Sequence, residues 1–241
     1  MFGGTTEGRT LSRELAALGA EVTVCVATDY GREEQGNFPG ITVLTGRLDA
    51  DGMADILQGA AICIDATHPY AVQATANIRA AAGRVGVPYH RLLRPSSPLP
   101  KGSVAVENAE EAVRYLRDTE GNVLLATGTK ALPAFSGLDS ARLYPRVLPA
   151  EESLAACEAA GIPRRNIIAM QGPFSKELNL ALLRQFDIRF LVTKDGGAAG
   201  GFGEKAAAAA EAGVKLLVIR RPAEEGEDFD AILRHCRELL T

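Results

Sequence analysis

Short apolar runs rich in β-branched residues alternate with amphipathic segments along the first ninety residues of the chain. Strands are predicted at residues 21–27, 41–45, 61–66 and 88–93. Helices with a periodic apolar face are predicted between them, at residues 10–18, 51–58 and 71–85. Strands that are apolar along their whole length and are separated by helices are typical of a parallel sheet covered on both faces.

The pattern breaks at residues 94–102, RPSSPLPKG, where prolines, serines and a glycine predict a connector. A second alternating series follows. Its strands are predicted at residues 123–126, 142–148, 166–170, 188–192 and 215–219, and its first and last helices at 107–117 and 229–240. We therefore predict an α/β protein with two Rossmann-like, doubly wound parallel-sheet domains, residues 1–95 and residues 103–241.

Composition and charge exclude several classes of protein. The chain has 241 residues, of which 46 % are hydrophobic and 23 % charged, with a net charge of −4. Nucleic-acid and membrane-surface proteins usually carry a basic excess, so we expect neither partner. No apolar run approaches the length of a membrane span, and none of the four cysteines forms a CxxC pair. Reduced, buried thiols are expected, which favours the cytoplasm.

GGTTEGR, residues 3–9, lies where the first strand of a Rossmann domain turns into its helix. Aligned on its last glycine, the turn departs from a GxGxxG fingerprint because Thr5 stands in the middle place. Glycines let the backbone approach a pyrophosphate, and a helix N-terminus supplies free N–H groups. The hydroxyls of Thr5 and Thr6 and the guanidinium of Arg9 would add donors. The alternative is a tight turn without a ligand.

The next strand ends in VATDYGRE, and Asp29 lies about 20 residues past the glycine turn. An acid at this place holds the ribose 2′-hydroxyl of NAD, whereas Thr28 and Arg32 beside it would suit the 2′-phosphate of NADP. A plain strand-end loop is the alternative, so the sequence leaves the choice of nucleotide open. Only two residues precede Gly3, and a central strand needs about five. Either this strand is a stub or translation begins upstream, and we expect the second.

Polar and glycine-rich clusters end strands in both predicted domains. They are GRLD and ATHPYA in the first domain, and ATGTK, MQGPFS and TKDGGAAGGFGEK in the second. In an open α/β sheet the ligand lies beyond the carboxyl ends of the strands. Lys130, Lys176, Lys194 and Lys205 would line one rim of the second domain, which suits an anion. Each cluster alone is also explained as a turn, and no spacing indicates a metal site.

Six motifs of the chain are, in order, GGTTEGR, DATHPYA, ATGTK, IIAMQGPFSKELN, TKDGGAAGGFGEK and VIRRP. They occur in the same order in the precorrin-6A reductases of cobalamin biosynthesis. The chain resembles that family over nearly its whole length. The resemblance implies two Rossmann-like domains with a cleft between them. It also implies that a reduced nicotinamide nucleotide, NADPH or NADH, reduces one double bond of precorrin-6A, or of cobalt-precorrin-6A, to give precorrin-6B.

The same resemblance implies roles for individual residues. The expected cofactor contacts are Gly3, Gly4, Thr5, Thr6, Glu7, Arg9 and Thr67, to which the spacing adds Asp29. His68 and Tyr70 would lie near the nicotinamide, and with Lys194 they are the candidate proton donors, solvent being the alternative. The expected substrate-binding residues are Thr127, Gly128, Lys130, Gln171, Gly172, Ser175, Lys194, Asp195, Gly201, Phe202 and Lys205.

The prediction is therefore a cytoplasmic NAD(P)H-dependent oxidoreductase that acts on a tetrapyrrole and carries no metal of its own. Hydride transfer needs a positioned nucleotide rather than a metal or a nucleophile. The carboxylates of the macrocycle would be neutralised by the lysines at the strand ends. Two alternatives remain, a non-catalytic nucleotide-binding sensor and a dehydrogenase of a small anionic substrate. The sequence does not indicate the oligomeric state.

Overall fold

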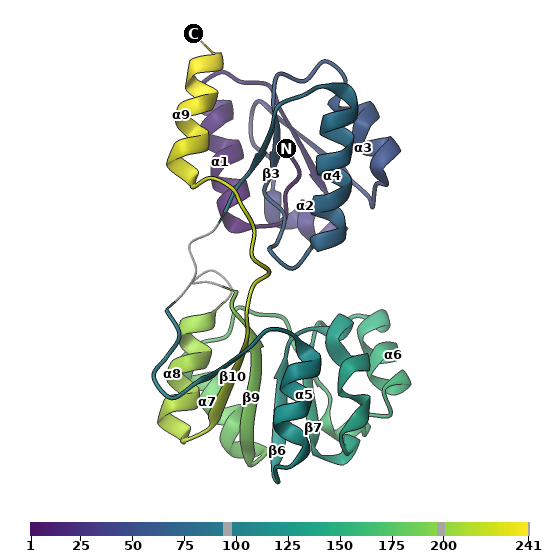
Figure 1. Cartoon of the computed structure of the whole chain (residues 1–241), viewed down its shortest axis with the longest axis vertical. Coiled ribbons are helices and arrows are strands. Elements are labelled where there is room, and N and C mark those ends of the chain that lie inside the picture. The colour runs from purple at the N-terminus through teal and green to yellow at the C-terminus, as the bar shows by residue number, and fades with distance from the viewer. Residues whose placement is uncertain (94–97, 197–200, 241) are drawn as a thin grey trace. The chain divides into compact units, whose positions relative to one another are not determined.

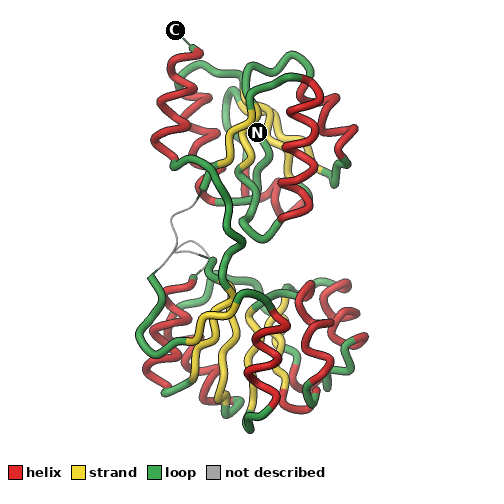
Figure 2. Tube along the Cα trace, viewed as in Figure 1, coloured by secondary structure: helices red, strands yellow, loops and turns green. Residues whose placement is uncertain are grey.

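The computed structural model describes residues 1–93, 98–196 and 201–240. Residues 94–97 of the predicted connector and residues 197–200 of TKDGGAAGGFGEK lie outside these ranges. The chain divides into two compact units, Met1–Pro95 with Pro222–Thr241 and Ser96–Arg221. Each unit is a parallel sheet with helices on its faces, which confirms the predicted α/β class (Figures 1 and 2).

In the first unit, Phe2 lies between two pairs of strands and joins them into one sheet. The elements of this unit are α1 (Thr6–Ala17), β1 (Val22–Val26), α2 (Asp29–Gln35), β2 (Ile41–Thr45), α3 (Ala50–Leu57), β3 (Cys63–Asp65), α4 (Val72–Val85), β4 (Tyr89–Arg91) and α9 (Phe229–Leu239). β1 pairs with β2 and β3 with β4, both in parallel. Phe2 bridges Cys25 of β1 and Asp65 of β3, so it lies at the centre of the order β2–β1–Phe2–β3–β4.

Both faces of this sheet are covered by apolar residues. Alternate residues of each strand point to opposite sides, and apolar residues occupy both sets. Val24 of β1 packs with Leu11 of α1 and Ile232 of α9 in one core cluster. The next residue, Cys25, belongs to a second cluster with Ile78 of α4. This two-sided burial explains why the strand reads as a continuous apolar run.

The end of the chain departs from the predicted domain boundary. The prediction placed residues 103–241 in the second domain, but from Pro222 onward the residues belong to the first unit. There α9 packs beside α1 and buries Leu233 and Cys236 (Figure 1). Before it, Glu227 N donates to Arg91 O and Leu93 N donates to Glu227 O, each at 2.8 Å. These bonds extend the edge of the sheet past β4.

The second unit contains one six-stranded sheet. Its elements are β5 (Val104–Val106), α5 (Ala109–Arg117), β6 (Asn122–Ala126), η1 (Thr129–Gly137), η2 (Ser140–Arg142), β7 (Leu143–Val147), α6 (Glu151–Ala159), η3 (Arg164–Asn166), β8 (Ile168–Ala169), α7 (Lys176–Gln185), β9 (Ile188–Lys194), α8 (Phe202–Ala212) and β10 (Lys215–Ile219). The strand order is β5–β10–β9–β6–β7–β8, and every pair is parallel.

Both sheets are doubly wound, as predicted. In the second unit the chain builds β7 and β8 on one side of β6, and then returns to place β9 and β10 on the other side. In the first unit β1 and β2 lie on one side of Phe2, and β3 and β4 on the other. The winding therefore reverses between Phe2 and β3 and between β6 and β9. Ligands of such folds bind at the carboxyl ends of the strands at these two points.

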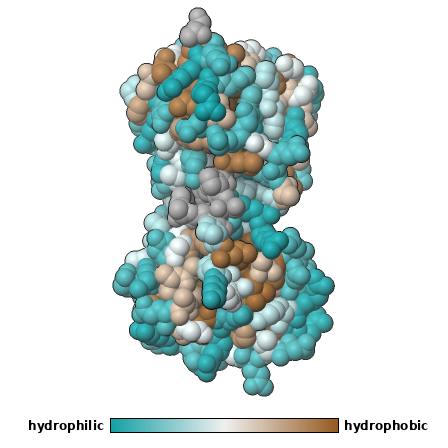
Figure 3. All heavy atoms as spheres, turned by 60° about the vertical axis from the view of Figure 1, so that its left-hand side comes forward, coloured by the Kyte–Doolittle hydropathy of each residue, from teal (hydrophilic) through white to brown (hydrophobic). Residues whose placement is uncertain are grey.

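The surface is mostly hydrophilic on the face drawn in Figure 3, with small groups of hydrophobic residues among the polar ones. Within the described ranges, no helix combines the length and the apolar character that a membrane crossing requires.

Candidate functional site

In the first unit the glycine turn is fixed between β1 and β3. Gly3 N donates to Cys25 O at 2.8 Å, and Thr5 Oγ1 donates to Ala66 O at 2.9 Å. Thr5 is also the N-cap of α1, because its hydroxyl oxygen accepts from Gly8 N at 3.1 Å. Gly4 has a φ of +135° and a Cβ placed there would meet nothing within 4 Å. The turn thus leaves an open backbone at the start of α1, which is the place where Rossmann folds bind a pyrophosphate.

Two of the predicted cofactor contacts, Arg9 and Asp29, have environments that the sequence did not predict. Arg9 Nη1 donates to Glu34 Oε2 at 2.8 Å and to Glu34 O at 2.7 Å, so a phosphate would have to replace this ion pair. Asp29 is the exposed first residue of α2, a helix that the sequence did not predict. The hydroxyl of Thr28 accepts from Gly31 N at 3.1 Å and caps that helix.

A buried ion pair lies beneath the loop that follows β3. Asp65 is fully buried and Arg91 is 2 % exposed, with Arg91 Nη1 donating to Asp65 Oδ1 at 3.0 Å. Thr67 donates to the same oxygen through its backbone N–H at 3.0 Å and its hydroxyl at 2.7 Å. Tyr89 OH donates to Asp65 Oδ2 at 3.0 Å. Asp65 therefore accepts four hydrogen bonds and fixes Thr67 at the carboxyl end of β3.

Arg91 extends this network to the returning end of the chain. It donates through Nη1 to Thr67 O at 2.9 Å and through Nε to Glu224 Oε2 at 2.9 Å. Beyond Thr67, the His68 and Tyr70 rings lie 5.5 Å apart between centroids. His68 is exposed and Tyr70 is half-buried. The geometry thus places Thr67, His68 and Tyr70 on one loop with a rigid base, beside the glycine turn.

In the second unit the carboxyl ends of β6 and β9 bring two predicted clusters together. Thr127 follows β6 and is 5 % exposed, and its hydroxyl has no hydrogen-bond partner among the described residues. Lys194 ends β9, and burial together with the charge of Lys130 lowers its pKa. Asp195 follows it and is buried, accepting from Arg221 Nη2 at 3.2 Å. Lys130 and Lys194, here called the cationic rim, therefore lie with the unsatisfied hydroxyl of Thr127 between β6 and β9, where the winding of the second sheet reverses.

The cluster after β8 is tied to β7. Ser175 caps α7, because its hydroxyl accepts from Leu178 N at 3.3 Å, while Gln171 is exposed. The Phe174 ring lies 4.1 Å from the guanidinium carbon of Arg146 in β7. Arg146 is 8 % exposed, and burial lowers its pKa to about 10. Arg146 is not among the residues expected from the sequence, although it is the one charged residue of the β7 strand and could have been recognised by that.

Gly201, Phe202 and Lys205 come from the start of α8. Gly201 has a φ of +62° and precedes the helix, and Phe202 is buried in the core below the sheet. Burial and the nearby charge of Arg146 lower the pKa of Lys205 to about 8. Phe202 therefore supports the fold, whereas Lys205 adds a cation close to Arg146.

The low pKa of Lys205 predicts that this residue's contribution to stability becomes more favourable in moderately alkaline solution. The unfolded chain holds this proton up to a pKa near the ordinary value of 10.5, whereas the folded protein releases it near 8. Between these values the unfolded state binds more protons at Lys205, so the part of the free energy of unfolding that this residue contributes rises with pH. Burial raises the pKa values of the four cysteines and acts in the opposite direction, so the test compares two proteins that share them. In urea unfolding at pH 7.5, 9 and 10, the wild type should gain stability relative to Lys205→Met as the pH rises. Equal pH dependence of the two proteins would contradict it.

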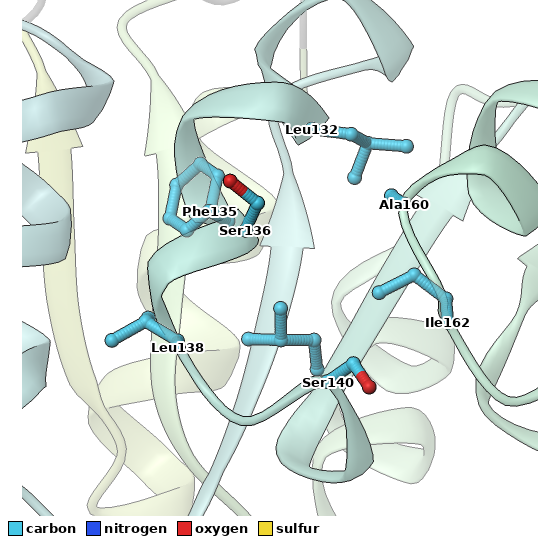
Figure 4. Close-up of a pocket in the computed structure, with 8 residues that line it drawn as sticks. Leu132, Phe135, Ser136, Leu138, Ser140, Ala160 and Ile162 are labelled. Carbon is cyan, nitrogen blue, oxygen red and sulfur yellow. The ribbon is translucent and has the colours of Figure 1, made fainter.

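A separate hollow of about 150 Å³ lies between η1, η2 and the end of α6 (Figure 4). It is lined by Leu132, Phe135, Ser136, Leu138, Ser140, Leu143, Ala160 and Ile162. Leu143 is the first residue of β7, so the hollow lies toward the amino ends of the strands. No charged side chain lines it, and it is not part of the two sites above.

Comparison with known proteins gives one consistent result. Residues 1–237 match the sequence profile of the family described as "Precorrin-6x reductase CbiJ/CobK". The chain is 34 % identical over 229 residues to a cobalt-precorrin-6A reductase of Priestia megaterium, covering 92 % of this chain and 89 % of the relative. It is 32 % identical over 230 residues to a precorrin-6A reductase of Mycobacterium tuberculosis, covering 92 % and 88 %.

The solved structures agree. The chain is similar to a structure described as "CobK precorrin-6A reductase", with a TM-score of 0.77 and 27 % identity. The match covers 98 % of this chain and 95 % of that one.

Proposed function

The chain belongs to the precorrin-6x reductase family, and from this premise we propose that it reduces a precorrin-6A macrocycle in cobalamin biosynthesis. The product would be the corresponding precorrin-6B. The substrate is either the metal-free or the cobalt-bearing macrocycle, since relatives of both descriptions match. The protein is thus proposed to be an oxidoreductase that uses a reduced nicotinamide nucleotide.

The observation that carries this proposal is that the two sheets offer different chemistry at the points where their winding reverses. The first has an open glycine turn at the start of α1, which suits a dinucleotide. The second has Lys130 and Lys194 beside the unsatisfied hydroxyl of Thr127, which suits a polyanion. A nucleotide sensor needs only the first of these sites. A reductase of a carboxylate-rich macrocycle needs both.

The turn and the loop after β3 have separate roles in this mechanism. The backbone of Gly3 and Gly4 and the N-terminus of α1 would hold the pyrophosphate, because Gly4 has no side chain to cover the backbone at this turn. When bound, the nucleotide supplies the hydride. Thr67 would orient the nicotinamide, because Asp65 and Arg91 fix its backbone and hydroxyl. This positioning lowers the entropy cost of the reaction.

A proton must also reach the reduced macrocycle. His68 and Tyr70 lie on the loop beside the glycine turn, and both carry an exchangeable proton. Lys194 is the third candidate, because its lowered pKa makes the ammonium a stronger acid. Gln171, Gly172, Ser175 and Asp195 are proposed to complete the substrate site.

We further propose NADPH as the nucleotide and the cytoplasm as the compartment. Arg32 lies one turn into α2 at the end of β1 and offers a cation to a 2′-phosphate. NADH remains the alternative, with Asp29 as the ribose ligand. All four cysteines are free and buried, which fits a reducing compartment.

An anaerobic assay of the purified protein tests the proposal. Cobalt-precorrin-6A and precorrin-6A are each mixed with NADPH or NADH, and nucleotide oxidation is followed at 340 nm while the product is identified by mass spectrometry. We expect a gain of two hydrogens in one macrocycle and faster oxidation of NADPH. Nucleotide binding without any reduction would favour the sensor. Oxidation of the nucleotide with a small 2-oxo acid, but not with a macrocycle, would favour the dehydrogenase.

A further inference from the structure

Arg146 of β7 is a buried cation without an acidic partner. Only 8 % of its surface is exposed, and the described residues place no carboxylate within ion-pair distance of its guanidinium. The nine residues outside the described ranges include no aspartate or glutamate. Buried charges are normally paired, because taking an unpaired ion out of water costs several kcal/mol. A buried arginine in this position is therefore expected to bind an anion that the described residues do not supply.

The guanidinium is held in one orientation by two neighbours. Nη1 donates to Asn179 Oδ1 at 2.8 Å, and Asn179 is fixed in turn because its Nδ2 donates to Ser175 O at 2.8 Å. The Phe174 ring packs against one face of the guanidinium in a cation–π contact. No hydrogen bond of the described residues uses Nε or Nη2 of Arg146. These two nitrogens form a fork that matches the two oxygens of a carboxylate.

This fork lies near the carboxyl edge of the sheet. Leu125 of β6 pairs with Pro145, so Arg146 is level with the end of β6, just before Thr127. Asn179 belongs to α7 and Lys205 to α8, two helices that pack side by side (Figure 1). Arg146 therefore contacts α7 through Asn179, and the charge of Lys205 on α8 lies close to it.

We propose that Arg146 anchors one carboxylate of the tetrapyrrole substrate through Nε and Nη2. The inference rests on the proposed function and adds a specificity-determining residue to it. A nucleotide phosphate shares the anionic chemistry, but a phosphate at this place would make the arginine part of the cofactor site. The two sources are separated by measuring both ligands.

Arg146→Met tests the proposal, because methionine fills similar space without the charge. Binding of cobalt-precorrin-6A, titrated without nucleotide and followed by its visible absorbance, should weaken about tenfold to a hundredfold. The KM for the macrocycle should rise, while kcat and the KM for NADPH change little. Arg146→Lys keeps the charge but not the fork, so its affinity should fall between the two. If Arg146→Met does not fold, Arg146→Lys alone tests the proposal, and its affinity for the macrocycle should be several-fold lower than that of the wild type.

Arg142→Met is the matched control. Arg142 lies just before β7, at the opposite edge, and donates to Gly121 O at 2.7 Å and Thr119 O at 2.5 Å. We expect it to lower the unfolding midpoint and to leave macrocycle affinity unchanged. Unchanged affinity in both Arg146 variants would overturn the inference alone, as would a rise confined to the KM for NADPH. A wild-type protein that neither binds nor reduces the macrocycle would overturn the proposed function as well.

Discussion

Arg91→Met is expected to lower the free energy of unfolding by about 3–5 kcal/mol, because it leaves the buried carboxylate of Asp65 without its cation. Thr67 would also lose two hydrogen bonds that Nη1 donates, and Glu224 of the returning segment would lose its arginine partner. The loop of Thr67 would then be less well oriented. We expect kcat to fall together with stability, in urea unfolding and in the anaerobic assay respectively.

Arg84→Met is the control for this variant, because it removes an arginine–aspartate pair of the same unit at the surface. The side chains of Arg84 and Asp51 are 52 % and 81 % exposed, and exposed pairs contribute about 0–1 kcal/mol. Arg84→Met should therefore leave the unfolding midpoint and kcat close to those of the wild type. Equal effects of the two substitutions would show that the buried network does not hold the loop.

Gly8→Val is expected to abolish nucleotide binding and to destabilise the first unit by about 1–3 kcal/mol. A Cβ at Gly8 would lie 2.7 Å from Ala66 Cβ and 3.3 Å from Thr5 Oγ1, so α1 would have to move away from β3. That movement breaks the hydrogen bonds by which Thr5 holds the turn. Calorimetric titration with NADPH and with NADH measures the loss.

A second helical glycine provides the comparison. Gly83 lies within α4, and a Cβ there would meet nothing within 4 Å. Gly83→Ala should leave nucleotide binding unchanged and raise stability by about 0.5–1 kcal/mol, because alanine favours the helix. Wild-type nucleotide affinity in Gly8→Val would show that the turn is not the pyrophosphate site.

The boundaries of several elements differ from the predictions for local reasons. The first helix begins at Thr6 rather than near residue 10, because Thr5 caps it, and the fingerprint is therefore part of the helix start. The strand predicted at residues 166–170 is limited to Ile168–Ala169, since Arg164–Asn166 form a 3₁₀ turn. The predicted helix at residues 229–240 is present as α9, but in the other unit.

By itself, the sequence determined the α/β class, the parallel strands, the glycine turn and the polar clusters at the strand ends. These features depend on apolar periodicity and on glycine and capping residues, which act over a few neighbours along the chain. The proximity of Lys130 and Lys194 was also predictable, because strand ends of a parallel sheet share one edge. Lys176, predicted for the same edge, instead forms an ion pair with Glu211 at 2.8 Å.

Only the tertiary structure decided which distant residues meet. Asp65 with Arg91 and Arg146 with Asn179 are separated by 26 and 33 positions, and their pairing depends on strand order and helix packing. The return of α9 to the first unit follows from the burial of Ile232, Leu233 and Cys236 beside α1. An amphipathic helix specifies that it must bury one face, but not which core receives it. That choice is made by the non-local contacts of the folded chain.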